Sequence, residues 1–270
     1  MNLKYVLYHG DAEKALKRVE SNSVHLVFTS PPYWSMRGEM EWSSFDEYYD
    51  KMKRIMEEVV RVVKYGRLVV VNMSDYIEDR ERYDLMWQWH KLLKEVGLKY
   101  RDWIIWEKPN ELICSGAGHM VGNFLKYKLP MYYSPDRVFE LLMVFSKGKV
   151  RIPEVTGRIK RLSVVDVNKV REYVRNVWHI PSRQDKDHPA VFPYKLAELV
   201  IMFYSFAGET VLDPFLGTGT TMAVAKQLNR SAIGCEINSK YIDIIKRNVG
   251  WNEMSLTSDF SYEYILEVVD

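Results

Sequence analysis

The sequence predicts an α/β fold with a doubly wound sheet, mostly parallel, that carries an antiparallel edge strand and an inserted region. Apolar runs of strand length alternate with amphipathic helical patterns over residues 5–106, which is typical of parallel sheets with helices on both faces. A second unit of strand, turn, helix and strand occupies residues 210–236. Residues 139–145 form a further apolar run that could pair with residues 100–106 as the antiparallel edge.

The N-terminal part of the chain contains three strand patterns, each followed by a helical pattern. Asp11 comes directly after the first strand and is placed to cap the helix that follows. Gly66 and Gly97 each follow a helical pattern, and we expect them to end those helices. The expected strands cover residues 5–8, 24–28 and 67–72, and the expected helices cover residues 11–19, 45–63 and 85–96.

The alternation returns after residue 192. A helix is expected over residues 194–206, a strand over 210–212, a helix that ends at Leu228 and a strand over 231–235. We therefore divide the chain into residues 1–145, with a loop insert at about 108–135, an insert at 146–187, and residues 188–270. The first and last of these segments are expected to be two halves of one domain.

Composition limits the class of protein. With 270 residues, 47% of them hydrophobic, the chain can build a sizeable core, and its net charge of +2 does not by itself indicate a nucleic-acid partner. Cys114 and Cys235 are too few for a disulfide framework or a metal site, so we expect no metal and a reducing, cytoplasmic environment. No signal peptide or membrane-spanning run is seen.

Positive charge is concentrated in one segment. Residues 146–187 contain eleven Lys or Arg against five Asp or Glu, whereas residues 252–270 contain five acidic residues and no Lys or Arg. A basic segment attracts phosphates, although a solvated loop face would have the same composition. The candidate phosphate contacts are Arg158, Lys160, Arg161, Arg171 and Arg175.

A Pro-Pro motif follows the second expected strand, in the stretch Thr29-Ser30-Pro31-Pro32-Tyr33-Trp34. Two prolines fix φ and remove two N–H donors, which makes a rigid loop at the carboxyl end of a strand, where open α/β sheets place ligands. The hydroxyl, the carbonyls and the aromatic faces suit a planar base that carries an amino group. A strand that merely ends at prolines, with Tyr33 and Trp34 in the core, is the alternative interpretation.

A Gly-rich turn follows the strand at 210–212, in the stretch Asp213-Pro214-Phe215-Leu216-Gly217-Thr218-Gly219-Thr220-Thr221. Together with Glu236 after the next strand, this is the pattern of a mononucleotide-binding unit, with Glu236 placed to bind ribose hydroxyls. Met222 stands where a dinucleotide fingerprint has its third glycine, and no P-loop lysine is present. The acidic Asp213 would repel a pyrophosphate and would suit the cationic or amino-acid end of S-adenosylmethionine.

These two motifs together resemble those of the amino-group DNA methyltransferases. The Asp213–Thr221 stretch and Gly234-Cys235-Glu236-Ile237-Asn238 look like the cofactor motif, and Thr-Ser-Pro-Pro-Tyr-Trp, with Arg37 three residues on, looks like the catalytic motif in its cytosine-N4 form. The catalytic motif comes first and a basic insert lies between the two, which matches the permuted β class. The resemblance implies a Rossmann-like methyltransferase sheet with a target-recognition insert.

The resemblance also implies roles for individual residues. The catalytic loop would be Ser30, Pro31, Pro32 and Tyr33. S-adenosylmethionine would be bound by Asp11, Asp213, Phe215, Gly217, Gly219, Thr220 and Glu236. Trp34 and Arg37 match the family's loop and are grouped with the basic insert as candidate DNA contacts.

The expected activity is methylation of the exocyclic N4 of a cytosine that is flipped out of duplex DNA, as part of a restriction-modification system with a separate endonuclease. Adenine-N6 methylation and an RNA substrate remain open, and oligomeric state is not predicted. A nicotinamide-dependent oxidoreductase would share the fold but gives no reason for Ser-Pro-Pro-Tyr. A catalytically silent DNA-binding protein would have no reason to retain both loops.

Overall fold

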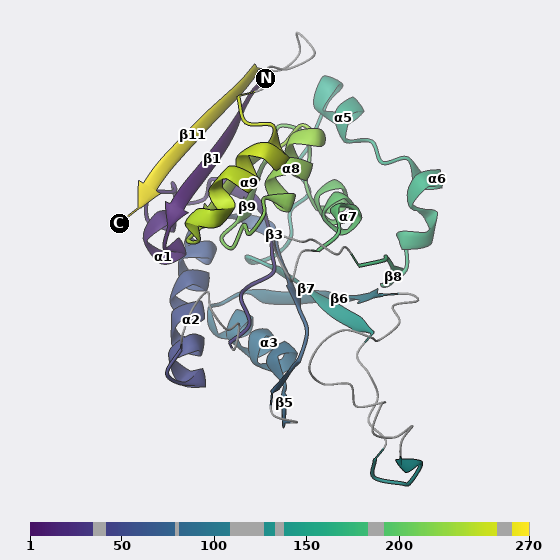
Figure 1. Cartoon of the computed structure of the whole chain (residues 1–270). Coiled ribbons are helices and arrows are strands. Elements are labelled where there is room, and N and C mark those ends of the chain that lie inside the picture. The colour runs from purple at the N-terminus through teal and green to yellow at the C-terminus, as the bar shows by residue number, and fades with distance from the viewer. Residues whose placement is uncertain are drawn as a thin grey trace.

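The structure is a computed structural model that describes residues 1–34, 42–78, 81–108, 127–132, 138–182, 192–252 and 261–269. Within these residues, nine strands form one sheet in the order β11-β1-β10-β9-β2-β3-β7-β6-β8 (Figure 1). The strands are β1 (Asn2–Gly10), β2 (Val24–Thr29), β3 (Val63–Met73), β6 (Lys99–Glu107), β7 (Phe139–Ser146), β8 (Val177–His179), β9 (Thr210–Asp213), β10 (Ser231–Glu236) and β11 (Ser261–Val269).

The predicted sheet is confirmed. From β11 to β3, all neighbouring strands pair in parallel, while β7 runs antiparallel to both β3 and β6. The predicted antiparallel pairing of residues 100–106 with 139–145 is therefore present. It does not form the edge itself, because β8 from the basic insert pairs in parallel with the outer side of β6.

Helices cover both faces of the sheet, which makes it doubly wound. On one face, α1 (Ala12–Leu16), α2 (Phe45–Val62) and α3 (Leu85–Glu95) pack their apolar sides onto the strands. On the other face, α7 (Tyr194–Tyr204), α8 (Thr220–Gln227) and α9 (Ser239–Val249) build a second core (Figure 1). Because strands β2, β7 and β9 are covered on both sides, their apolar residues form continuous runs rather than an alternating pattern.

The prediction for Gly66 is wrong. Helix α2 ends at Val62, and Gly66 lies inside β3, where its φ is +84° and its N–H donates to the Lys147 carbonyl at 2.7 Å. A Cβ on Gly66 would lie 2.9 Å from Cβ of Arg151. This glycine is therefore required for a close approach of two chain segments, not for ending a helix. Gly97 does follow α3, with φ +88°.

Several elements were not among those expected. The basic insert contains two short helices, α5 (Gly157–Ser163) and α6 (Val167–Val170), a 3-10 turn at Arg171–Tyr173, and β8. A small hairpin is formed by β4 (Tyr76–Glu78) and β5 (Glu81–Tyr83). Helix α9 and strand β11 complete the C-terminal part. None of the helices in the described part of the chain is long and apolar enough to cross a membrane.

The sheet contains one topological switch point that matters for the site. Neighbouring strands β9 and β2 pair in parallel, but the chain leaves β9 toward α8 and β10 on one side and leaves β2 toward α2 and β3 on the other. The two connections lie on opposite faces of the sheet. Ligands of open α/β sheets bind in the crevice that such a switch opens at the carboxyl ends of the strands.

Candidate active site

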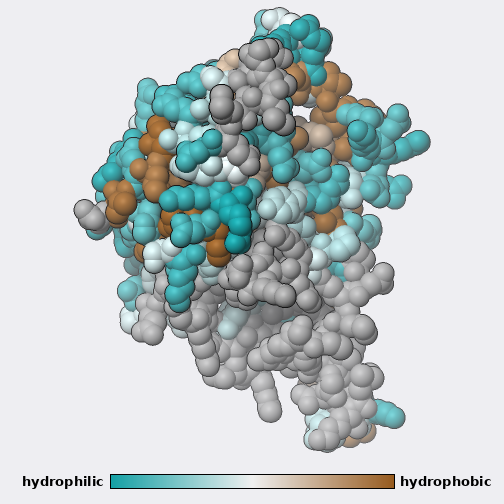
Figure 2. All heavy atoms as spheres, turned by 45° about the horizontal axis from the view of Figure 1, so that its top comes forward, coloured by the Kyte–Doolittle hydropathy of each residue, from teal (hydrophilic) through white to brown (hydrophobic). Residues whose placement is uncertain are grey.

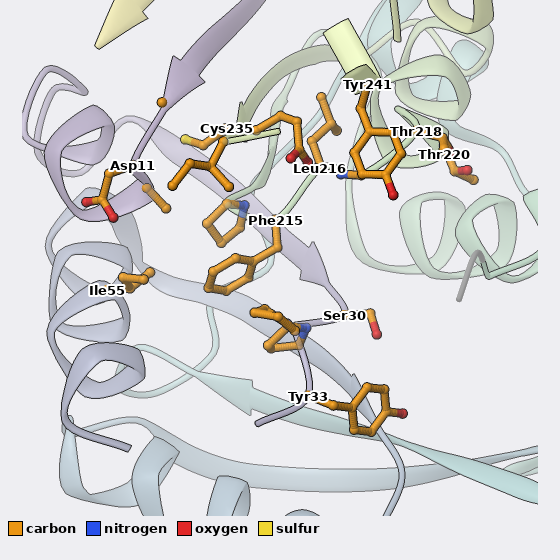
Figure 3. A pocket seen from close by; sticks show the side chains of 18 of the residues that line it. Asp11, Ser30, Tyr33, Ile55, Phe215, Leu216, Thr218, Thr220, Cys235 and Tyr241 are labelled. Carbon is orange, nitrogen blue, oxygen red and sulfur yellow. Dashed lines mark hydrogen bonds between the residues drawn. The ribbon is translucent and has the colours of Figure 1, made fainter. Parts of the chain in front are cut away.

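A cavity lies at this switch point, and its wall comes from the carboxyl ends of four parallel strands. About 1010 Å³ of atom-free space lies in the cavity and at its solvent-open mouth. Figure 3 shows Phe215 between the Gly-rich turn and the Ser30 and Tyr33 end of the Pro-Pro loop. The lining residues are Gly10, Asp11, Ala12, Ser30, Pro31, Pro32, Tyr33, Ile55, Phe192, Pro214, Phe215, Leu216, Gly217, Thr218, Thr220, Cys235, Glu236, Ile237 and Tyr241.

The Gly-rich turn is shaped by glycines on two elements. Gly217 and Gly219 have φ of +55° and +90°, and Gly219 is the N-cap of α8. In β10, Gly234 lets Leu216 lie on the sheet, because a Cβ on Gly234 would be 2.4 Å from Cδ2 of Leu216. The Leu216 N–H donates to the Cys235 carbonyl at 2.9 Å, which ties the turn to β10. The turn is thus held close to the sheet with its backbone toward the cavity.

Glu236 ends β10 and lines the cavity. One carboxylate oxygen accepts a hydrogen bond from the Gly217 N–H at 2.7 Å, and the other accepts one from the Asn238 N–H at 2.7 Å. Each oxygen of an ionised carboxylate has two lone pairs. These two backbone donors therefore fix the direction of the side chain in the cavity wall.

Asp213 lies beneath the cavity and is not among its lining residues. Its carboxylate accepts hydrogen bonds from the Thr29 hydroxyl at 2.6 Å, the Thr221 hydroxyl at 2.7 Å and the Phe215 N–H at 3.0 Å. Burial raises the pKa of Asp213 to about 6, against the lowering effect of these three donors. The side chain thus joins the end of β2 to the turn and to α8, which differs from the ligand contact that the sequence suggested.

Thr220 is the first residue of α8 and lines the cavity. Its hydroxyl is buried and has no hydrogen-bond partner among the described residues. Buried polar atoms are nearly always paired, so an unpaired one in a cavity wall marks a position where a ligand or a water completes the bonding. A helix N-terminus of this kind also offers backbone N–H groups that no carbonyl of the helix accepts.

Asp11 ends the loop after β1 and lines the cavity from the other side. Its side chain accepts a hydrogen bond from the Lys14 N–H at 3.2 Å, so it caps α1 as predicted. The Lys51 ammonium group lies 2.8 Å from the second carboxylate oxygen of Asp11 and 3.0 Å from Glu13. Lys51 on α2 therefore compensates the negative charge at this end of the cavity.

The Pro-Pro loop brings four of the predicted residues to the same cavity. Ser30, Pro31, Pro32 and Tyr33 all line it, and the Pro32 carbonyl accepts a hydrogen bond from the Tyr48 hydroxyl at 3.0 Å. The Tyr33 ring lies 6.1 Å from the Tyr76 ring of the β4–β5 hairpin. The two motifs that the sequence singled out, far apart in the chain, therefore form one site.

Trp34 is half-buried by aromatic neighbours. Its ring lies 6.1 Å from that of Phe45 and 5.9 Å from that of Tyr83, and its indole nitrogen is buried without a partner in the described part of the chain. This packing agrees with the core-filling alternative for Trp34, and its role as a DNA contact stays a prediction. Arg37 lies outside the described residues.

The basic residues of the insert lie apart from the cavity lining. Lys160, Arg161, Arg171 and Arg175 are exposed, and Arg158 is half-buried. They lie on α5, at the top of Figure 1, and on the 3-10 turn and the residues before β8, which is at its right. In the view of Figure 2, the surface of the described residues is largely hydrophilic, with scattered hydrophobic patches. No group of three or more His, Cys, Asp or Glu that could hold a metal ion is found in the described ranges.

Known proteins give an independent comparison. A family model described as DNA methylase, N6_N4_Mtase, matches residues 24–247. The chain is 28% identical to the type II methyltransferase M.MjaI of Methanocaldococcus jannaschii, over 95% of this chain and 94% of that protein. It is 31% identical to the type II methyltransferase M.HpaI of Haemophilus parainfluenzae, over 88% of this chain and 72% of that protein.

The fold is similar to that of a protein from Thermus thermophilus described as a proposed DNA modification methylase. The TM-score is 0.75 with 27% identity, and the match covers 97% of this chain and 99% of that one. A structure of the same protein complexed with S-adenosyl-L-methionine gives a TM-score of 0.72 at 27% identity, over 98% and 100% of the two chains. The match of the family model over most of the sequence, on a fold with both motifs at one cavity, shows that the chain belongs to the N6_N4 DNA methylase family.

Proposed function

We propose that this protein transfers a methyl group from S-adenosylmethionine to the exocyclic N4 of a cytosine flipped out of duplex DNA. Family membership supports DNA methylation, and the proposal adds the cofactor, the base and the residues. The observation that carries it is the shared cavity, where the Ser30–Tyr33 loop meets the Gly-rich turn. A base and a nucleoside cofactor must lie against each other for direct transfer, and one cavity with both loops allows this.

The cavity wall fits S-adenosylmethionine in its chemistry. The Glu236 carboxylate in the cavity wall would accept hydrogen bonds from ribose hydroxyls, and the unpaired Thr220 hydroxyl and the start of α8 suit the carboxylate of an amino acid. Phe215 offers an apolar face, and Gly217 allows close approach of the backbone. Asp11 and Gly219 are the remaining residues of the proposed cofactor-binding set. The T. thermophilus relative, which was crystallised with S-adenosyl-L-methionine, supports this choice.

In this proposal Asp213 acts indirectly. Its carboxylate is buried beneath the cavity lining and accepts hydrogen bonds from Thr29, Thr221 and Phe215, so its contribution is to hold the turn and the Pro-Pro loop in register. The bound cofactor supplies a methyl group already activated by the sulfonium. The remaining task of the chain is to orient and activate the amino nitrogen.

Cytosine N4 is a weak nucleophile because its lone pair is delocalised into the ring. The Ser30 hydroxyl and the Pro31 carbonyl would accept hydrogen bonds from the two N–H groups and so favour a pyramidal nitrogen with a localised lone pair. Pro32 stiffens the loop, and the Tyr33 face would stack on the base. The amino group is paired inside a duplex, so the base must leave the helix to reach Ser30.

The insert at residues 146–187 is proposed as the target-recognition region. Lys160, Arg161, Arg171 and Arg175 are exposed on it and carry the charge for phosphate contacts, with Arg158 as a half-buried member. Trp34 is packed and is better placed to support the loop than to meet DNA. Strands from residues 1–145 and 188–270 alternate within one sheet, in the order β1-β10-β9-β2, while β8 of the insert lies at its end, which supports treating these two segments as halves of one domain.

Ser30 favours cytosine as the base, since the family more commonly has Asp at this loop position in adenine-N6 enzymes. Adenine-N6 methylation is the second candidate, because the adenine amino group has the same electronic problem and the same need for two acceptors. RNA as substrate is a lesser alternative, since exposed basic residues do not distinguish the two polymers. A cognate endonuclease would act on the same DNA sequence as a separate protein.

The test is methyl transfer from labelled S-adenosylmethionine to mixed-sequence duplex DNA, with duplex RNA in parallel, followed by nucleoside analysis. N4-methylcytosine is expected. N6-methyladenine would refute the interpretation of Ser30, and label in RNA alone would refute the DNA substrate. Ser30→Ala should lower turnover about 100-fold or more with cofactor affinity unchanged. An equal loss of cofactor binding would place Ser30 in the cofactor site instead.

A further inference from the structure

A buried chain of hydrogen bonds reaches the Pro-Pro loop from the helices on one face of the sheet. The Trp89 indole N–H of α3 donates to the Tyr48 hydroxyl oxygen at 2.8 Å, and the Tyr48 hydroxyl donates to the Pro32 carbonyl at 3.0 Å. Both side chains are 1% exposed. Because an indole nitrogen can only donate, Tyr48 must accept from Trp89, and its single proton is left for Pro32.

The Tyr48 hydroxyl is not explained by core packing. Its ring packs against those of Phe45 and Trp42, with centroids 5.8 and 5.6 Å away, and a phenylalanine would fill the same volume. A buried hydroxyl costs free energy unless it is hydrogen-bonded, and this one is bonded on both sides. Burial also raises the pKa of Tyr48 well above its usual value, so the group is a permanent donor.

The Pro32 carbonyl is the atom of the loop whose direction proline does not fix. The two rings set φ of Pro31 and Pro32, but the carbonyl direction follows ψ of Pro32. That carbonyl lies in the planar peptide that leads to Tyr33. Its orientation therefore decides in which direction the Tyr33 side chain leaves the loop.

We propose that Tyr48 is a positioning residue for methyl transfer, which orients the Pro32–Tyr33 peptide and through it the surface against which the target base stacks. This inference rests on the proposed function, and it adds a residue outside both motifs. Tyr48 lies in the first turn of α2, after Ser44 caps the helix by accepting from the Glu47 N–H. The position of the loop is therefore tied to where α2 begins.

The test compares Tyr48→Phe with wild type in single-turnover methylation of DNA, together with titration of S-adenosylmethionine. The variant keeps the ring and loses the donor, so the rate should fall about 10- to 100-fold, because small misplacements at a reacting centre have effects of this size. Cofactor affinity should stay within about twofold, since no cofactor contact is removed.

Tyr5→Phe is the matched control. The Tyr5 hydroxyl is also buried, on β1, and has no hydrogen-bond partner among the described residues. The same atom is removed from an equally buried ring, and the rate should not change. Urea unfolding of both variants checks that the assays use folded protein.

The outcomes separate the two proposals. An active wild type and an equally active Tyr48→Phe would overturn the positioning role alone. Equal loss of rate in Tyr48→Phe and Tyr5→Phe would also overturn it, because the effect would then be one of general core stability. A wild type that binds S-adenosylmethionine but methylates neither DNA nor RNA would overturn the proposed function and the positioning role with it.

Discussion

Thr29→Val removes one hydrogen bond at the junction of the two motifs and keeps the shape of the side chain. The lost bond runs from the Thr29 hydroxyl to Asp213 at 2.6 Å, and both residues are buried. Hydrogen bonds to charged groups contribute about 1.5–3 kcal/mol, and neutral ones about 1 kcal/mol. The expected loss of unfolding free energy therefore depends on whether Asp213 is ionised.

The pKa of Asp213, raised by burial to about 6, sets the pH dependence. At pH 8 the carboxylate is ionised and the loss should be about 2 kcal/mol, while at pH 5 it is mostly protonated and the loss should be about 1 kcal/mol. The sign follows from linkage. Because the pKa of Asp213 is higher in the folded state than in the unfolded state, the free energy of unfolding falls as pH rises toward 6. Removing a donor raises the folded-state pKa further, so the free energy of unfolding of the variant falls over a wider pH range.

Urea unfolding at pH 5 and pH 8 measures both values. Thr221→Val removes a 2.7 Å hydrogen bond to the other oxygen of Asp213, and its loss of unfolding free energy should show the same pH dependence as that of Thr29→Val. Thr156→Val is the control, because Thr156 is exposed and its side chain makes no capping hydrogen bond to α5. Its effect should be below about 0.5 kcal/mol at both pH values. Equal losses for Thr29→Val at both pH values would refute the role assigned to the Asp213 charge.

Two further changes test the turn and the opposite end of the sheet. Gly234→Ala places a Cβ 2.4 Å from Cδ2 of Leu216, so it should cost about 1–3 kcal/mol in urea unfolding and weaken S-adenosylmethionine binding; unchanged binding would show that the turn can move. Burial, reinforced by Lys64, lowers the pKa of His25 to about 4, so its contribution to stability is lost as pH falls from about 6.5 to 4. His25→Gln should flatten that part of the pH profile relative to wild type, and an unchanged slope would contradict the assignment.

Regular elements could be predicted where periodicity and end signals agreed. Strand β2, helix α3 and the unit from β9 to β10 lie within a few residues of their expected bounds. Strand β11 is not among the predicted elements, because the dominant feature of residues 252–270 is their acidic charge. Its residues do alternate: Tyr262 and Tyr264 pack on Tyr5, while Glu263 pairs with Lys4 at 3.1 Å. That alternation is a strand signal that the sequence contains.

The site could be predicted from the sequence only as far as its residues follow strand ends. Ser30, Glu236 and Asp11 each come at or directly after the end of a parallel strand, so the sheet brings them to the same edge. Tyr48 has no such marker, because it is one apolar position among many on α2. Asp213 bonds to Thr29 and Thr221 because it is buried. The sequence motif shows that this residue is acidic but not that it is buried. The roles of such residues depend on contacts between elements that are distant in sequence, and local sequence patterns do not predict these contacts.

The short ladder between β2 and β9 explains why side chains join the two motifs. Only Leu26 with Val211 and Val27 with Leu212 pair in the register of these strands. After these pairs the chain continues from β9 and from β2 to helices on opposite faces of the sheet, as at a switch point, and the register of the two strands has no further pair. The Thr29 to Asp213 bond continues the connection just where the ladder has ended, across 184 residues of sequence. The separation that admits a ligand also removes backbone bonds between the two strand ends, and in this chain the buried carboxylate of Asp213 joins them instead.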